Sequence, residues 1–258
     1  MTPAQFALLV LAGIGGGLTG SIAGLASLVS YPALLATGLP PVTANVTNTV
    51  ALVLNGVGSV SASGPELRGQ ERRLLRLSGG AVLGGAAGAA LLLLTPSDAF
   101  ERIVPWLIAA ASIALLVQRP PRELAERGAA AHPTHRDPWW LPAVVFAVAI
   151  YGGYFGAAAG VMLLALFLLS TGEGLARGNA LRNVVLLAAN VTASIGFVVF
   201  APVAWSAALP LAIGLFVGGR LGPPVVRRAP QLLVRRLIAL AGLGLAVHLA
   251  VQAYGQSG

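Results

Sequence analysis

Asparagine is the polar residue whose placement in this sequence is most distinctive. The six asparagines fall into two clusters, Asn45, Asn48 and Asn55, then Asn179, Asn183 and Asn190. Each cluster lies in a long apolar stretch, beside Thr47 in the first and Arg182 in the second. Amide and hydroxyl groups there can hydrogen-bond neighbouring helices, at about 0.6–2 kcal/mol each, or replace the hydration of a bound oxyanion.

Position within the predicted helices separates the two roles. Asn48 and Asn183 lie in the first turns of helices predicted over 43–63 and 179–200, so we assign them, with Thr47, to anion contact. Asn55 and Asn190 lie one or two turns deeper, and we assign them to packing.

Arg182 is the only charged residue in 178–219. Two interpretations stay open for it: a side chain that extends to the membrane interface, or a cation near the substrate path.

Glycine clusters precede both asparagine clusters. They comprise Gly13, Gly15, Gly16, Gly17, Gly20 and Gly24 in the first, and Gly152, Gly153, Gly156 and Gly160 in the second. Glycines allow close packing of membrane helices, which is one interpretation. The other is that the helix unwinds, so that half-helix N-termini direct free N–H groups at a buried anion. That interpretation assigns the backbone of Ser21–Gly24 and Ala157–Gly160 to the site.

Several kinds of chemistry are excluded. The chain has no cysteine, and its apolar segments contain no Ser–His pair, Asp–Asp pair or His-Glu-x-x-His motif. We therefore predict no enzymatic activity, no metal site and no cofactor. The acidic residues all lie in or beside predicted loops, which argues against a proton-coupled pump.

Composition identifies the class of protein. Of 258 residues, 57% are apolar and 9% are charged, whereas soluble domains carry about 25% charged residues. No charged side chain precedes Glu66, and 65 helical residues extend about 98 Å, or about three crossings of a hydrocarbon core. The chain is therefore predicted to be a polytopic α-helical membrane protein. Its net charge of +8 comes from arginines, most of them in short loops, as the positive-inside rule requires, and does not indicate nucleic acid.

The two halves of the chain share an internal repeat. Gly20 and Gly24 match Gly156 and Gly160 at an offset of 136, and the Asn48–Asn55 segment matches Asn183–Asn190 at 135. We infer a duplication, with one repeat over 1–118, a polar cytoplasmic linker over 119–138 and a second repeat over 139–258.

Each repeat is predicted to hold an interrupted helical hairpin and three transmembrane helices. The predicted segments are 4–36, 43–63, 76–95 and 101–118 in the first repeat, and 139–171, 179–200, 205–222 and 232–254 in the second. Each hairpin is expected to have two arms of about 15 residues, and whether the arms span the membrane or re-enter stays open.

Arginine placement predicts that the repeats are inverted. Loop 66–76 holds four arginines while its equivalent, 201–205, holds no charge; loop 224–236 holds four while its equivalent, 96–102, is nearly neutral. Opposite bias in equivalent loops is typical of inverted-topology repeats. Both termini are then expected outside the cell.

The stretch GLTGSIAGLASLVSYPALLATGLPPVTANVTNTVALVLNGVGS carries a family pattern: a glycine-rich segment, a proline, a leucine, a glycine turn and an Ala-x-x-Thr element. The matching positions are Gly20, Gly24, Pro32, Leu34, Gly38, Ala44 and Thr47, with Gly156, Gly160, Ala180 and Asn183 in the second half. In this the chain resembles the sulfite exporter TauE/SafE family of bacterial inner-membrane permeases. The resemblance implies export of sulfite or an organosulfonate such as sulfoacetate.

We therefore predict a secondary transporter that exports a small sulfur-containing anion. The predicted contacts are Asn48, Asn183, Thr47, Ser21, Gly24, Ala157 and Gly160, with Arg182 as an electrostatic helper. An importer or channel for another solute, and a non-transporting scaffold subunit, are the alternatives. The exact substrate, the coupling ion and the oligomeric state, including a homodimer, stay open.

Overall fold

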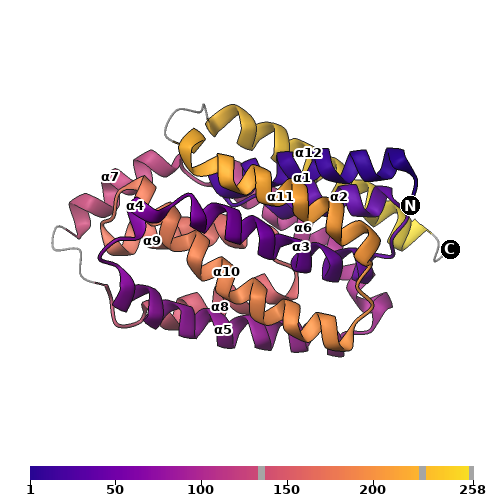
Figure 1. Cartoon of the computed structure of the whole chain (residues 1–258), viewed down its shortest axis with the longest axis horizontal. Coiled ribbons are helices and arrows are strands. Elements are labelled where there is room, and N and C mark those ends of the chain that lie inside the picture. Colours follow the sequence, from indigo (N-terminus) through magenta and orange to yellow (C-terminus); the bar gives the residue numbers. More distant parts are fainter. Residues whose placement is uncertain (133–136, 227–230, 256–258) are drawn as a thin grey trace.

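The computed structural model describes residues 1–132, 137–226 and 231–255, which fold as a bundle of α-helices. The helices are α1 (Pro3–Ala23), α2 (Ala26–Ala36), α3 (Pro41–Ser61), α4 (Gly64–Leu67), α5 (Glu71–Leu94), α6 (Ser97–Val117), α7 (Pro121–Ala131), α8 (Leu141–Tyr154), α9 (Ala159–Thr171), α10 (Leu175–Phe200), α11 (Trp205–Val226) and α12 (Gln231–Gly255). Most lie along one long axis, with the N-terminus and the end of α12 at one end and α4 and α7 at the other (Figure 1). The arginine-rich loop predicted at 224–236 lies partly outside the described residues, because 227–230 are not among them.

Five of the described helices, α1, α5, α6, α10 and α11, are long and apolar enough to cross a membrane, which confirms the prediction of a polytopic α-helical membrane protein. The α3 helix does not qualify, although its 21 residues would suffice in length. Its asparagines and threonines lower its mean hydropathy. Most of them are buried against other helices rather than exposed to lipid. Their polar groups can therefore hydrogen-bond within the protein, which offsets the free-energy cost of placing them at membrane depth.

Two helical hairpins, α1–α2 and α8–α9, each return to the end from which they start. In the first hairpin, Gln5 Nε2 near the start of α1 donates to the carbonyl of Thr37, just beyond α2, over 3.5 Å. In the second, Arg73 pairs with Asp137 before α8 and with Glu173 after α9, at 2.8 and 2.6 Å. Since Arg73 lies in the first turn of α5, at the α4–α7 end, the two hairpins enter the bundle from opposite ends (Figure 1).

The breaks fall where the backbone adopts left-handed conformations. Gly24 has φ 78° between α1 and α2, and Gly156 and Ala158 have φ 77° and 63° between α8 and α9. The second hairpin has nearly equal arms, as expected. The first does not: α1 has 21 residues and α2 has 11, because α1 continues past the middle of the segment until Gly24 ends it.

The two halves exchange their hairpins. The α1 helix packs on α11 and the α8 helix packs on α5, so each hairpin lies against the other half, while α3 and α10 pack together at the centre. The contacts are close because they use glycine: a Cβ on Gly13 would lie 2.9 Å from the Cα of Gly214, and a Cβ on Gly153 would lie 3.1 Å from that of Gly85. For Gly13 and Gly153 the packing interpretation is therefore right.

The linker contains a helix that the sequence analysis did not predict. One face of α7 is buried on α9, where Leu124 joins Leu164 and Leu168 in a small apolar cluster. Gly128 lies so close to the backbone of Leu168 that no Cβ fits there. The segment 119–138 is thus partly packed against the second hairpin rather than wholly exposed.

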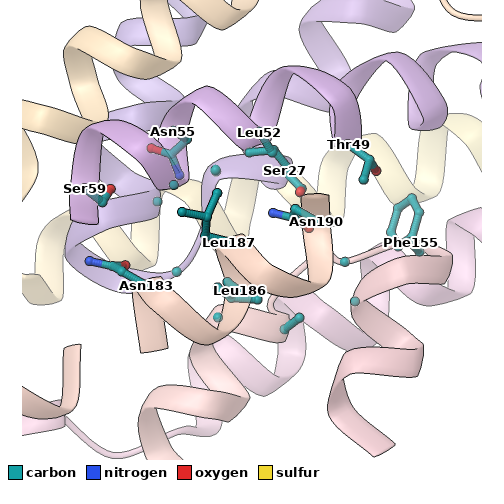
Figure 2. Close-up of a pocket in the computed structure, with 18 residues that line it drawn as sticks. Ser27, Thr49, Leu52, Asn55, Ser59, Phe155, Asn183, Leu186, Leu187 and Asn190 are labelled. Carbon is teal, nitrogen blue, oxygen red and sulfur yellow. The ribbon is translucent and has the colours of Figure 1, made fainter. Parts of the chain in front are cut away.

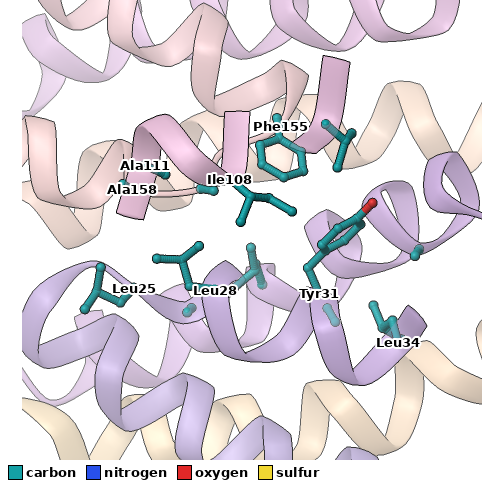
Figure 3. Close-up of a cluster of buried hydrophobic side chains, with 14 of the residues drawn as sticks. Leu25, Leu28, Tyr31, Leu34, Ile108, Ala111, Phe155 and Ala158 are labelled. Carbon is teal, nitrogen blue, oxygen red and sulfur yellow. The ribbon is translucent and has the colours of Figure 1, made fainter. Parts of the chain in front are cut away.

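The return arm of the first hairpin is buried between α6 and the second break. Leu28 and Tyr31 of α2 face Ile108 of α6 and Phe155 of the break (Figure 3). The rings of Tyr31 and Phe155 meet edge to face with centroids 5.4 Å apart, an arrangement that aromatic pairs favour. This cluster joins α2 to the other half of the chain.

The tips of the two hairpins touch, which yields a stability prediction. A Cβ on Gly160 would lie 2.7 Å from the Cα of Gly24, whereas a Cβ on Gly152 would lie 3.7 Å from the nearest side-chain atom. We expect Gly160→Ala to lower the free energy of unfolding by about 1–3 kcal/mol through overpacking. Gly152→Ala should leave it unchanged or raise it slightly, since alanine favours helix. Thermal unfolding in detergent measures both, and equal losses would contradict the tip contact.

Candidate functional site

A small cavity of about 50 Å³ lies at the centre of the bundle, between the two breaks and helices α3 and α10 (Figure 2). It is lined by Gly20, Gly24, Ala26 and Ser27 from the first hairpin; Gly152, Phe155, Gly156, Ala159 and Gly160 from the second; Thr49, Leu52, Asn55, Gly56 and Ser59 from α3; and Asn183, Leu186, Leu187 and Asn190 from α10. A buried water needs about 10–15 Å³ on this measure, so the cavity has room for about three to five small atoms or waters.

Two helix N-termini open onto this cavity. The α2 helix begins at Ala26 and the α9 helix at Ala159, and both residues line the cavity. Neither helix has a side-chain cap at its N-terminus. Some of their first N–H groups already donate to backbone carbonyls: Leu28 to Leu25 in α2, and Ala159 and Val161 to Gly156 and Ala158 in α9. Both N-termini are still the positive ends of their helix dipoles, so both favour a negatively charged ligand.

Arg182 is buried beside the cavity and is 0% exposed. Its Nη2 donates to the carbonyls of Gly20 and Ser21, each at 2.9 Å, and to Oδ1 of Asn183 at 2.7 Å. Within the described part of the chain no carboxylate pairs with it. Its partner is instead the carbonyl end of α1, which carries the negative end of that helix's dipole. The side chain therefore does not extend to the membrane interface.

Three hydrogen-bond donors at this point have no acceptor among the described residues: Nε and Nη1 of Arg182, and Nδ2 of Asn183. A guanidinium only donates, so Oδ1 of Asn183 must face Arg182 and Nδ2 must be the free group. A Cβ on Gly24, which lines the cavity, would lie 2.8 Å from Nη1 of Arg182. Buried donors without partners are rare, and together these three require an acceptor such as an anion or ordered water.

The charge around the cavity has one sign. No acidic residue lines it, and Arg182 with the two helix N-termini makes its surroundings positive. A cation would find no compensating carboxylate there. The arrangement is therefore suited to a small anion that accepts several hydrogen bonds.

Of the residues predicted to contact the anion, Gly24, Gly160 and Asn183 line the cavity, and Arg182 adjoins it. Asn48 does not line it: its Oδ1 accepts from Ser30 at 2.5 Å and its Nδ2 donates to Ser27 at 3.2 Å, so the amide joins α3 to α2.

The remaining predicted residues also serve other contacts. Thr47 Oγ1 accepts from the backbone N–H of Ala204 at 3.0 Å. The Ser21 hydroxyl lies 2.6 Å from that of Ser59, and only its carbonyl faces Arg182. Ala157 is buried in the second break, where its carbonyl accepts from the Tyr151 hydroxyl at 2.6 Å.

Asn55 and Asn190, which we had assigned to packing, both line the cavity (Figure 2). The signal for Asn190 was its spacing: it follows Asn183 by seven residues, two helical turns, and so lies on the same face of α10. Ser27, Thr49 and Ser59 also line the cavity. The sequence signals for two of them were the match of Ser59 with Ser194 at the repeat offset of 135 and the position of Thr49 beside Asn48.

Comparison with known proteins identifies a family and two relatives. Residues 9–249 match the family model described as Sulfite exporter TauE/SafE. The chain is 26% identical over 265 residues to the "Probable membrane transporter protein YfcA" of Escherichia coli (strain K12), covering 99% of this chain and 93% of the relative. It is 28% identical over 249 residues to the "Probable membrane transporter protein ORF9" of Sinorhizobium sp, covering 94% and 91%. No solved structure shows significant similarity to the chain.

The different surroundings of Asn183 and Asn48 give a paired test. Asn183→Ala removes a free donor at the cavity, and a charge-assisted hydrogen bond contributes about 1.5–3 kcal/mol, so binding of an oxyanion, with sulfite as the probe, should weaken by about ten- to a hundred-fold. Asn48→Ala breaks only contacts to two serines and should lower stability with a smaller effect on affinity. Titration calorimetry and thermal unfolding of the purified protein measure both. Equal affinities in the two variants would remove Asn183 from the site.

Proposed function

The chain belongs to the sulfite exporter TauE/SafE family and is a multi-pass membrane transporter, and from this premise we propose that it exports a small sulfur-containing anion across the bacterial inner membrane. The anion is sulfite, whose four non-hydrogen atoms match the cavity of about 50 Å³, or an organosulfonate such as sulfoacetate, which has twice as many and requires the cavity to widen during transport. The observation that carries the proposal is the group of three unpartnered donors on Arg182 and Asn183 at the central cavity.

A sulfur oxyanion matches the donors that surround the cavity. Its oxygens accept hydrogen bonds from several directions, as the two helix N-termini and the free nitrogens of Arg182 require. Hydrogen bonds between a guanidinium and an anionic oxygen are about twice as strong as neutral ones. Asn55 and Asn190, on opposite helices, can supply further amide donors to the same ligand.

We propose further that the two halves are inverted repeats, with the 119–138 linker in the cytoplasm. The hairpins enter from opposite ends of the bundle, and each packs on the other half. The arginine-rich loop at 66–76 lies at the α4–α7 end, away from the termini (Figure 1). This arrangement supports a two-fold relation in the membrane plane, with the cavity between the repeats.

The direction of transport follows from charge. An anion that leaves a cell with a negative interior gains about 2.3 kcal/mol per charge for each 100 mV. Because no carboxylate lines the cavity to carry a proton, export driven by the membrane potential alone is the simplest mechanism. The alternatives predict other results: an importer of the same fold would carry the anion inward, and a scaffold would show no flux.

Flux measurements test the substrate and direction. In oriented vesicles, labelled sulfite or sulfoacetate should leave the cytoplasmic side faster when that side is made negative. Arg182→Gln removes the buried charge and should lower the flux by about a hundred-fold or more, since charged hydrogen bonds contribute about 1.5–3 kcal/mol each. Arg220→Gln, at an exposed arginine of α11, is the matched control. Uptake in place of efflux would favour an importer, and absence of flux would favour a scaffold.

Cysteine labelling tests the inverted topology. Single cysteines at Gly69 and Ala229 should react with impermeant reagents only from the cytoplasm, and one at Ser97 only from outside. Ala229 lies outside the described residues, and its expected side follows from the arginines around it. Because Ser97 and Ala229 occupy equivalent loops, labelling of both from one side would overturn the inversion.

A further inference from the structure

Each half supplies one asparagine that holds the broken helix of the other half. Asn45 Nδ2 donates to the carbonyl of Tyr154, the last residue of α8, at 2.9 Å. Asn179 Nδ2 donates to the carbonyl of Ser21, in the last turn of α1, at 3.0 Å. A carbonyl only accepts, so in both amides the nitrogen must face the helix end. Asn45 and Asn179 are 1% and 3% exposed, and neither lines the cavity.

The two helix ends are held unequally. The end of α1 also accepts two hydrogen bonds from Arg182, at the carbonyls of Gly20 and Ser21. At the end of α8, in the described part of the chain, Asn45 is the one side chain that donates to the Tyr154 carbonyl. The side chains of Tyr151 and Gln118 donate farther along this break, to the carbonyls of Ala157 and Val161, and both are neutral, unlike Arg182. By the repeat offset of 135, the position equivalent to Arg182 is Thr47, which is neutral and bonds the backbone of Ala204 instead.

The second break is also the more strained of the two. Ala158, which precedes α9, has φ 63° and is the one non-glycine residue with positive φ in the described chain. Such a conformation persists only when its surroundings enforce it. Phe155, Gly156, Ala159 and Gly160 of this break all line the cavity, so a change in the break would move the α9 N-terminus and the cavity wall together.

We propose that Asn45 is a positioning residue for the anion site: it fixes the second break, and through it the N-terminus of α9, whereas Asn179 does the same for the first break with Arg182 as a second support. The claim that Asn45 affects anion binding rests on the proposed function. The claim that the two helix ends are anchored unequally does not. The two asparagines, one from each half, should consequently differ in their effect when replaced.

The test compares Asn45→Ala and Asn179→Ala in the purified full chain. Hydrogen–deuterium exchange without ligand should show faster exchange by at least about tenfold in residues 152–160 of Asn45→Ala. In Asn179→Ala, residues 20–26 should exchange at nearly the wild-type rate, because Arg182 still holds that helix end. Similar acceleration of both breaks, or of neither, would overturn the proposal.

Binding and flux provide the functional part. Sulfite affinity should fall by about tenfold or more in Asn45→Ala and by less than about threefold in Asn179→Ala. Asn45→Leu keeps a side chain of similar size but has no hydrogen-bond donor, so it should behave like Asn45→Ala. If Asn45→Ala does not fold, exchange and binding are measured on Asn45→Leu alone. An Asn45→Leu protein with wild-type exchange and affinity would overturn the proposal.

The outcomes separate this inference from the proposed function. If wild-type protein binds none of sulfite, sulfoacetate or sulfate, the proposed substrate is wrong, but unequal exchange at the two breaks would still support the unequal anchoring. If the wild type binds sulfite and the two asparagine variants lose affinity equally, the transporter proposal stands and the positioning role of Asn45 is wrong. Equal loss of melting temperature with unchanged affinity would assign both asparagines to stability alone.

Discussion

The burial of one positive charge against a broken helix is the interaction on which the rest of this structure depends. Arg182 has no carboxylate partner among the described residues and no exposure, so its charge must be compensated by dipoles. The carbonyl end of α1 supplies them, and it exists at this depth only because Gly24 ends the helix in a left-handed conformation. The Gly20 carbonyl accepts from Gly24 as well as from Arg182, but in a continuous helix through residues 3–36 the Ser21 carbonyl would accept from the N–H of Leu25, so the guanidinium would lose an acceptor.

The same break gives the site its ligand preference. Ending α1 makes room for α2 to begin at Ala26, and its uncapped N-terminus faces the cavity. In the second hairpin, α9 begins at Ala159 in the same way, with an uncapped N-terminus at the cavity. The break in the first hairpin thus creates the negative helix end that holds Arg182. The two breaks together create two positive helix ends, at α2 and α9, that face the ligand. Both kinds of exposed backbone group are tolerated at membrane depth only inside a protein, which is why the breaks lie between packed helices.

The exchange of hairpins between halves explains why the site requires the whole chain. Gly24 and Gly160 come from different halves, yet their backbones are in contact. Arg182 and Asn179 of the second half hold the end of α1, and Asn45 of the first half holds the end of α8. Neither half can form the cavity alone. Glycine contacts such as Gly13 with Gly214 let these helices approach closely enough for short side chains to reach across.

The sequence by itself determined the class of protein, the order of its long apolar helices and the glycine-rich segments in which both breaks lie, although it missed α7 and the unequal arms of the first hairpin. These depend on local properties: long uncharged runs, and glycines where the helix ends. It also indicated Asn183 and Arg182 as candidate site residues, because polar and charged side chains in membrane segments cost free energy and typically serve a function. It did not determine which asparagines face the ligand. Asn48 and Asn183 occupy equivalent positions, yet Asn48 bonds Ser27 and Ser30 while Asn183 lines the cavity and bonds Arg182. Only the tertiary structure decided this, because a side chain's role depends on which helix packs opposite it, and that partner comes from a distant part of the chain.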